Sequence, residues 1–329
     1  MLVLRFRPVT AADLESWLEE LGVDARECSP LAGDLSQRCY FRIALDQGGS
    51  LLAAYYPESL RPAMVRFVAA RSLLAGAGVR VPEILHSSVE RGFMLVEDLG
   101  SATLFELSGG PSAERTARFL AAVQNAGRIA ELDVHEVERL GNPPLDGSLL
   151  RRELEATFDY LLDPGGLADL AAPRQTLRLA LDDLCARLGG DRLVPCHRDF
   201  MARNLIPLGE GVAVIDFQDL RLGPPAYDLA SLLNDSFFPE PALEGLLLPE
   251  RWRAGSACDQ YARAVVQRAL KAAGTFARFA AQGNPRHVPL IAPTLARAAR
   301  HLEVLPETSG AYRHLRGWWT SQLVPGAIC

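Results

Sequence analysis

The sequence is almost devoid of lysine. Its 34 basic residues include a single lysine, Lys271, so the other 33 are arginines. Lysine is therefore removed from nearly every role that it could fill in a binding or catalytic site. Arginine is therefore the main cationic side chain that can meet a phosphate or a carboxylate in this chain, and it binds such groups through a planar, forked set of donors.

Cysteine and long apolar runs are scarce as well. The six cysteines are scattered, without a CxxC pair or the spacing of a metal site, and are typical of a reducing compartment. No run approaches 18 uninterrupted apolar residues, which argues against a membrane-spanning helix. The amino-terminal MLVLRFRPVTAADL is charged too soon for a signal peptide. We therefore expect a cytoplasmic protein with no membrane partner.

Excess positive charge is absent too, since the net charge is −6. General nucleic-acid binders are normally basic, so no nucleic-acid partner is expected. Apolar residues make up 49% and charged residues 22% of the 329 residues, an ordinary globular balance. A chain of this length can bury a sizeable core and is long enough for about two domains.

The first hundred residues predict a small, mostly antiparallel sheet with helices. An amphipathic helix is expected over residues 10–21, followed by two strands, RCYFRIAL and SLLAAYYP, joined by a Gly-rich hairpin. A helix over residues 64–78 and the strand-like runs VPEIL and GFMLVEDLG complete this part.

The rest of the chain predicts a larger helical lobe. Helices are expected over residues 112–133, 148–162, 172–188 and 256–282, interrupted by a β island at residues 193–219. We therefore predict an α+β, bilobal fold with an N-lobe over residues 1–99 and a C-lobe over residues 100–329. Clefts between lobes are favoured ligand sites.

The β island contains HRDFMARN, residues 197–204, where polar residues follow an apolar run. Phosphoryl transfer needs a carboxylate to deprotonate the attacking hydroxyl and oxygen ligands that hold magnesium on the phosphates. Asp199 supplies a candidate base and Asn204 a neutral oxygen ligand, and Asp216 ends the strand that returns beside this loop. Asp and Asn beside a turn also serve as simple caps. The following IDFQD and GPPAYDLASLL favour the magnesium-nucleotide site.

These segments resemble a known family. HRDFMARN, VIDFQD and GPPAYDLASLL are similar to the catalytic loop, metal-binding segment and following helix of the aminoglycoside phosphotransferase (choline-kinase-like) family, which has a protein-kinase-like fold. SQRCYFR, VPEILHSSVERGFMLVEDLG and QRALKAAGTFARF resemble, more narrowly, the anomeric kinases of N-acetylmuramate and N-acetylglucosamine in peptidoglycan recycling. The resemblance runs from about residue 10 to residue 305.

The resemblance implies an ATP- and Mg2+-dependent sugar kinase with a role for each matching residue. Asp199 would be the general base, while Asn204 and Asp216 would hold Mg2+. His197 would support the loop and Asp228 would tie it to the helix that follows. Arg203 would reach a phosphate or remain solvated.

The N-lobe departs from the kinase pattern, because the strand that carries a phosphate-binding Lys in protein kinases reads LLAAYYP here. Ser36 and Arg38, with Arg42 as a further candidate, are predicted to meet the phosphates instead. Arg38 could also be a solvated strand residue. The hinge Glu97–Leu99 is predicted to meet adenine through its backbone, with Glu97 and Leu99 as the contacts.

The predicted acceptor contacts are Gln218, Asp219, Asp235, Arg268 and Lys271. Carboxylates and amides suit paired sugar hydroxyls, while Arg268 and Lys271 could meet a lactyl carboxylate or face solvent. The partners expected for this chain, as a monomer, are MgATP and a small sugar. Two alternatives stay open at this point: a kinase of another small alcohol (aminoglycoside, choline or amino acid), and a nucleotide-binding pseudokinase without turnover.

Overall fold

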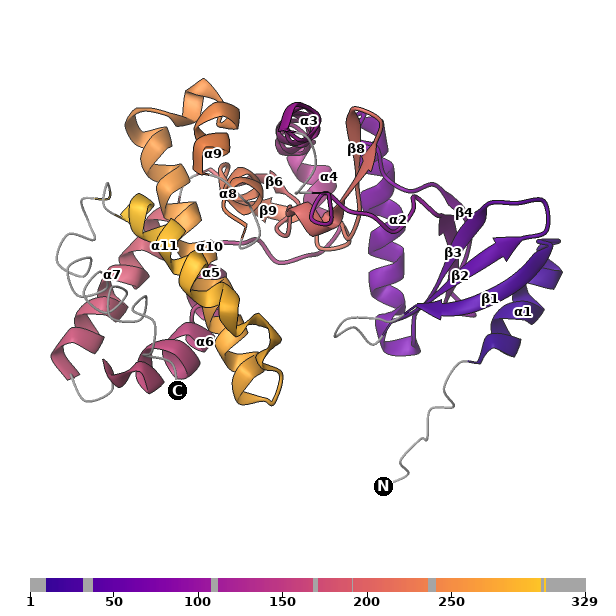
Figure 1. The fold of residues 1–329 in the computed structure, drawn as a ribbon, viewed down its shortest axis with the longest axis horizontal. Helices are drawn as coiled ribbons and strands as arrows, with labels where there is room; N and C mark the ends of the chain where they lie inside the picture. The colour runs from indigo at the N-terminus through magenta and orange to yellow at the C-terminus, as the bar shows by residue number, and fades with distance from the viewer. Residues whose placement is uncertain are drawn as a thin grey trace.

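The computed structural model describes residues 10–31, 38–107, 112–167, 171–190, 192–235, 241–302 and 305. The amino-terminal part contains α1 (Ala11–Glu20), β1 (Ala25–Leu31), β2 (Cys39–Leu45), β3 (Ser50–Tyr55), η1 (Glu58–Leu60), α2 (Arg61–Gly76), β4 (Ile84–Ser88) and β5 (Phe93–Glu97). Figure 1 shows this sheet and its helices on one side of the molecule and the helix-rich remainder on the other.

The five strands form an antiparallel sheet in the order β1-β2-β3-β5-β4. The predicted hairpin is present, because Cys39 to Ala44 of β2 pair with Tyr55 to Ser50 of β3, and Gly48 and Gly49 take positive φ in the turn. The strand predicted at VPEIL begins only at Ile84, so residues 81–83 precede it.

Successive side chains of each strand point to opposite faces of the sheet, and both faces bury apolar residues. On one face α1 buries Leu14, Trp17 and Leu18 against the sheet, with Trp17 stacked on Phe93 at 5.3 Å between ring centroids. On the other face Met64 of α2 packs on Met94 and Val96. Helix α1 begins after the N-cap Thr10, whose hydroxyl accepts from the backbone N–H of Asp13.

The remainder contains α3 (Ser112–Ala130), α4 (Val134–Glu138), α5 (Gly147–Glu153), α6 (Glu155–Thr157), η2 (Phe158–Leu167), α7 (Ala171–Gly190), β6 (Val194–Cys196), η3 (Ala202–Asn204), β7 (Leu205–Leu208), β8 (Gly211–Val214), β9 (Arg221–Gly223), α8 (Tyr227–Leu233), α9 (Pro241–Leu247), η4 (Glu250–Trp252), α10 (Gly255–Ala281), η5 (Pro285–Leu290) and α11 (Ile291–Leu302). The helix predicted over 148–162 is divided into α5, α6 and the first part of the π-helix η2. Within the described part of the chain, no helix combines the length and apolar character needed to cross a membrane.

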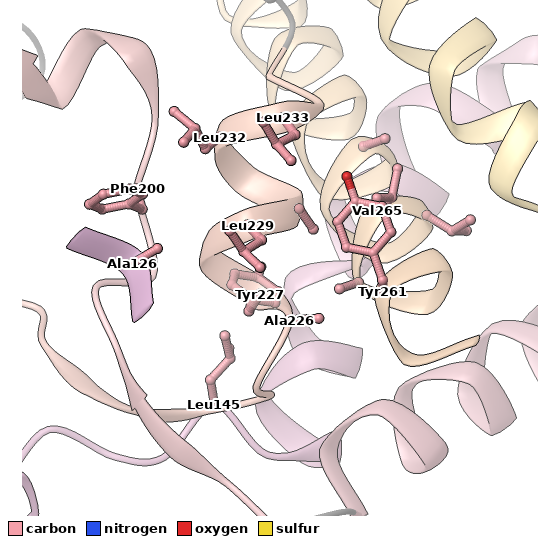
Figure 2. Packing of buried hydrophobic residues seen from close by; sticks show 14 of the residues in the cluster. Ala126, Leu145, Phe200, Ala226, Tyr227, Leu229, Leu232, Leu233, Tyr261 and Val265 are labelled. Carbon is pink, nitrogen blue, oxygen red and sulfur yellow. The ribbon is translucent and has the colours of Figure 1, made fainter. Parts of the chain in front are cut away.

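Helix α8 forms the centre of this lobe. All seven of its residues are buried, which is expected of a helix that packs on every side. Figure 2 shows α8 beside Tyr261 and Val265 of the long helix α10, and the Tyr227 hydroxyl of α8 donates to Gln267 of α10 at 3.1 Å. The strands β7 and β8 form a hairpin, and β6 pairs with β9. The short strands therefore place the predicted catalytic loop and Asp216 next to the core.

Gly274 of α10 allows a close helix contact, and its replacement by alanine is expected to destabilise the protein. A Cβ at this position would lie 2.5 Å from the backbone nitrogen and the Oγ1 of Thr157 in α6. Because the clash involves backbone, Gly274→Ala should lower the free energy of unfolding by about 1–3 kcal/mol. Gly127→Ala in α3 is the matched control, since a Cβ there has no neighbour within 4 Å. Urea unfolding should show the control unchanged or slightly more stable; equal stability of the two variants would contradict the contact.

Candidate active site

The loop between β6 and β7 is fixed by one carboxylate from the start of α8. Asp228 is 5% exposed and accepts hydrogen bonds from the backbone N–H groups of His197, at 2.7 Å, and Arg198, at 3.0 Å. Burial raises the pKa of Asp228, while the two backbone donors favour its ionised form. Arg198 has a φ of 76°, a left-handed conformation that a non-glycine residue keeps only when its surroundings hold it. Asp228 supplies that restraint.

His197 links the loop to the strand before Asp216. Its ring is fully buried, its Nε2 lies 3.0 Å from the carbonyl oxygen of Ile215, and it meets Phe200 edge-on. These contacts place His197 beneath the loop.

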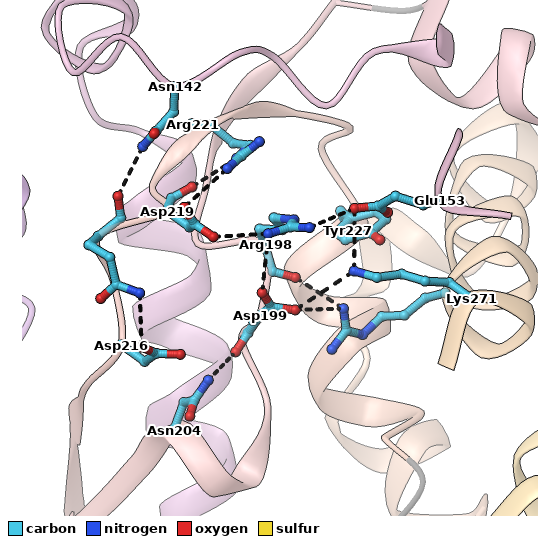
Figure 3. A network of polar contacts seen from close by, with 12 residues as sticks. Asn142, Glu153, Arg198, Asp199, Asn204, Asp216, Asp219, Arg221, Tyr227 and Lys271 are labelled. Atoms are coloured by element: carbon cyan, nitrogen blue, oxygen red, sulfur yellow. Dashed lines mark hydrogen bonds and ion pairs between the residues drawn. The ribbon is translucent and has the colours of Figure 1, made fainter. Parts of the chain in front are cut away.

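Asn204 and Asp216 face the same cavity. The amide nitrogen of Asn204 donates to the carbonyl oxygen of Asp199 at 2.8 Å, so its Oδ1 is left to accept or to ligate. The backbone N–H of Ile215 donates to the carbonyl of Asn204 at 3.0 Å, which brings Asp216 alongside. Asp216 has a φ of 61° and accepts from Gln218 Nε2 at 2.9 Å. Figure 3 shows Asn204 and Asp216 near each other, with the Asp199 carboxylate turned away from them.

The donor set fits Mg2+. Mg2+ is coordinated by oxygen atoms, several of which belong to waters or to substrate phosphates. One carboxylate and one oriented amide oxygen therefore suffice as protein ligands. No group of three or more His, Cys, Asp or Glu side chains gathers in metal-binding geometry among the described residues. Such a cluster would suit a tighter all-protein metal site.

A cavity of about 790 Å³ lies between the sheet and the helical lobe. Apolar walls come from Leu52, Val96 and Phe217, while Leu99 and Gly100 line its hinge side. The Glu97 side chain is engaged by Arg80 and by the backbone N–H of Glu83. The cavity therefore offers an apolar slot beside hinge backbone, with Asn204 and Asp216 at its other side.

Arg38 reaches into this cavity from the start of β2. Its guanidinium lies 3.5 Å from Asp216 Oδ1 and over the rings of Tyr40 and Tyr56, and its side chain is 16% exposed. Arg42 is instead paired with the hinge carboxylate of Asp98 at 2.7 Å. The predicted Ser36 lies outside the described residues.

Three cations surround the carboxylate of Asp199. Arg268 and Lys271, one turn apart on α10, lie 3.5 and 3.9 Å from Oδ1, and Arg198 lies 3.7 Å from Oδ2. Burial would raise the pKa of Asp199, but Lys271, Arg268 and Arg198 together hold it well below its usual range. Asp199 is therefore ionised. Burial lowers the pKa of Lys271, against the opposing effect of Asp199 and Glu153.

Glu153 completes this network and was not predicted from the sequence. Its carboxylate is 9% exposed, 2.8 Å from Arg198 and 3.5 Å from Lys271. No local pattern marks it, because it lies 45 residues before Arg198 in the chain. Arg198 was not predicted as a site residue either, although it lies between His197 and Asp199 in the sequence.

The other predicted acceptor residues are less close together. Asp219 pairs with Arg198 at 2.9 Å and Arg221 at 3.2 Å, as Figure 3 shows. Asp235 is 9% exposed and follows the far end of α8. The guanidinium of Arg203, which was predicted to reach a phosphate or remain solvated, lies 4.7 Å from the ring centroid of Phe105.

Comparison with known proteins identifies this arrangement. The family model described as "Phosphotransferase enzyme family" matches residues 27–265. An N-acetylmuramate/N-acetylglucosamine kinase of Pseudomonas aeruginosa is 34% identical, over 83% of this chain and 82% of its own length. A protein of the same name from Neisseria meningitidis is 29% identical over 92% of both chains.

Solved structures agree on the fold. The GDP and kanamycin complex of the aminoglycoside phosphotransferase APH(2")-IIIa superposes with a TM-score of 0.63 at 14% identity, covering 89% of this chain and 98% of its own. Choline kinase LicA from Streptococcus pneumoniae gives 0.59 at 16% identity, covering 87% and 98%. The predicted protein-kinase-like, bilobal fold is confirmed.

Proposed function

The chain belongs to the phosphotransferase enzyme family, and we propose that it phosphorylates the anomeric hydroxyl of N-acetylmuramate and N-acetylglucosamine with MgATP. The observation that carries this proposal is the 34% identity, over most of both chains, to a kinase named for these two sugars. The reaction makes the chain a sugar kinase. The alternatives of another small-alcohol kinase or a pseudokinase are not favoured, because the named relatives are sugar kinases and the base and both metal-ligand candidates are present.

Asp199 is proposed to orient and deprotonate the anomeric hydroxyl. An anomeric hydroxyl is more acidic than an ordinary alcohol, so a carboxylate is an adequate base. Most of the acceleration then comes from positioning and from neutralising the charge of the transferring group. Asn204 and Asp216 would hold Mg2+, which supplies charge neutralisation on the ATP phosphates. The fixed loop geometry supports this assignment, because Asp228 and His197 hold Asp199 in place.

The cations around Asp199 support an acidic or neutral acceptor rather than a cationic one. Arg268 and Lys271 are proposed to meet the lactyl carboxylate of N-acetylmuramate, and Gln218, Asp219 and Asp235 the sugar hydroxyls. A polycationic aminoglycoside would be repelled by the same two side chains. We further propose that the chain works as a monomer in the cytoplasm, where ATP is supplied, in the recycling of cell-wall sugars.

The direct test is ATP consumption by the purified protein with Mg2+ on a panel of acceptors. The panel contains N-acetylmuramate, N-acetylglucosamine, glucose, choline and kanamycin. Turnover should be confined to, or much faster on, the two N-acetyl sugars. Turnover on choline or kanamycin alone would retain a kinase and overturn the sugar assignment, while bound MgATP without turnover on any acceptor would favour a pseudokinase.

Arg38 is proposed to replace the N-lobe lysine of protein kinases as the cation on the ATP phosphates. A charge-assisted hydrogen bond contributes about 1.5–3 kcal/mol, so Arg38→Met should lower kcat/KM for ATP by about 10- to 150-fold. Arg91→Met is the control, since Arg91 is an exposed N-lobe arginine paired with Glu20. Steady-state kinetics at varied ATP provides the measurement. A change of less than about threefold in Arg38→Met would remove Arg38 from the phosphate site.

A further inference from the structure

A second concavity, of about 680 Å³, lies at the amino-terminal end of α10. Its wall is built from the end of α7, the approach to β6, the turn before α8, the short helix η4 and the first turns of α10. None of the predicted site residues that the structure describes lines it. Asp259 in its wall and Lys271 at the active site are 12 residues apart on one helix, which is about 18 Å along the axis.

The charge in this concavity favours an anion. Among the described residues, Arg187, Arg192 and Arg263 line it together with one carboxylate, Asp259. Arg187 also pairs with Asp183 at 2.8 Å, and Arg263 lies 4.0 Å from Asp259. Arg192 is exposed. Three arginines in one concavity form a local group of positive side chains in a chain whose net charge is −6.

The end of α10 adds backbone donors to this charge. The 27-residue helix begins after Ala254, which provides no side-chain cap, and its first turn contains no acidic residue. Ser256 and Ala257 of that first turn line the concavity. Uncapped N–H groups and the positive end of the helix dipole attract phosphate and carboxylate groups.

Independent evidence for a ligand comes from Gln260. Its side chain is 8% exposed and lines the concavity, yet neither its amide nitrogen nor its amide oxygen has a hydrogen-bond partner among the described residues. The indole N–H of Trp252, in the same wall, is also buried and unpartnered within the described part of the chain. Buried polar groups are nearly always satisfied. Gln260 requires both an acceptor and a donor, which a hydroxyl group supplies.

We propose that this concavity binds a phosphorylated sugar. The phosphate lies against Arg192, Arg263 and the start of α10, and sugar hydroxyls lie against Gln260. A volume of about 680 Å³ falls within the range of small-molecule sites. Arg192 precedes β6, which leads into the loop that carries Asp199, and Pro225 precedes α8, whose Asp228 holds that loop. The site is separate from the acceptor site and does not rest on the identity of the kinase substrate.

Isothermal titration calorimetry with glucose 6-phosphate tests the site, with inorganic phosphate and glucose as separate titrants. MgADP and N-acetylglucosamine are present in excess to occupy the active site. The full-length protein should show one saturable event, weaker for phosphate and undetectable for glucose. Arg192→Ala should weaken it by about 10- to 150-fold, since one charge-assisted contact is lost. Basal kinase activity should be unchanged in this exposed variant.

Two further variants make the result specific. Gln260→Leu should weaken sugar phosphate binding while leaving phosphate binding unchanged, and Arg139→Ala, at an exposed arginine paired with Glu136, should bind like the parent. Absence of saturable binding, or Arg192→Ala binding like the parent, would overturn the site. Equal affinities for phosphate and for glucose 6-phosphate would overturn the sugar component and leave an adventitious ion only.

Discussion

Asp199→Asn is expected to lower kcat by about 10²- to 10⁴-fold, the usual contribution of a positioned general base. Asparagine keeps the shape of the side chain and cannot accept the proton of the anomeric hydroxyl. The backbone of residue 199 should stay in place, because its carbonyl still accepts from Asn204 and the loop is still held by Asp228. The loss should therefore fall on kcat, with MgATP binding retained.

Single-turnover and steady-state kinetics, together with nucleotide-dependent thermal stabilisation, separate these effects. Asp133→Asn is the matched control, because Asp133 caps the exposed start of α4 and asparagine caps equally well. It should be indistinguishable from the parent. If Asp199→Asn retained more than about a tenth of the parental kcat, the proton would have to pass to another group and the role assigned to Asp199 would be wrong.

Asp228→Ala is expected to lower the free energy of unfolding by about 2–6 kcal/mol, since two buried backbone donors lose their acceptor at about 1–3 kcal/mol each. The donors are the N–H groups of His197 and Arg198. Without the carboxylate, the left-handed Arg198 keeps its ion pairs with Glu153 and Asp219 but loses the acceptor of its own N–H, so the orientation of Asp199 should also change. The variant should therefore be both unstable and inactive.

Asp228→Asn provides the graded control, because its single amide oxygen can replace only one of the two acceptors. Chemical denaturation should place it between the parent and Asp228→Ala. Unfolding free energies of the parent and Asp228→Ala that agree within error would show that the loop is held by other contacts.

Local patterns predicted much of the fold. The long helix expected over 256–282 is α10, Gly255–Ala281, because its apolar stripe repeats at helical spacing. The strand β1 was missed, since Ala25–Leu31 reads ARECSPL, without alternation and with a proline. Such an edge strand forms through pairing with β2 rather than through its own propensity. The change from α6 to the π-helix η2 after Thr157 lies where Gly274 of α10 approaches closely, a contact that no local pattern marks.

The sequence likewise predicted one part of the site and missed another. Asp199, Asn204 and Asp216 are recognisable because they lie on one loop and the adjoining strand, at fixed spacing. The ion-pair network around Asp199 is not recognisable in the sequence, because Glu153, Arg268 and Lys271 come from helices distant in sequence. They meet only in the folded chain. Lys271 and Arg268 were singled out as acceptor contacts, and their pairing with the base carboxylate emerged only from tertiary structure.

The position of the phosphate on the product distinguishes phosphorylation at the anomeric hydroxyl from phosphorylation elsewhere on the sugar. The purified protein is incubated with MgATP and N-acetylglucosamine, and the sugar phosphate is examined by proton-coupled phosphorus NMR. Phosphate on C1 should give a doublet that collapses when the anomeric proton is selectively decoupled, whereas a doublet from phosphate on C3 or C4 would persist. Phosphate on C6 would couple to two protons, and that pattern, or the absence of any sugar phosphate with this sugar and with N-acetylmuramate, would contradict the proposed function.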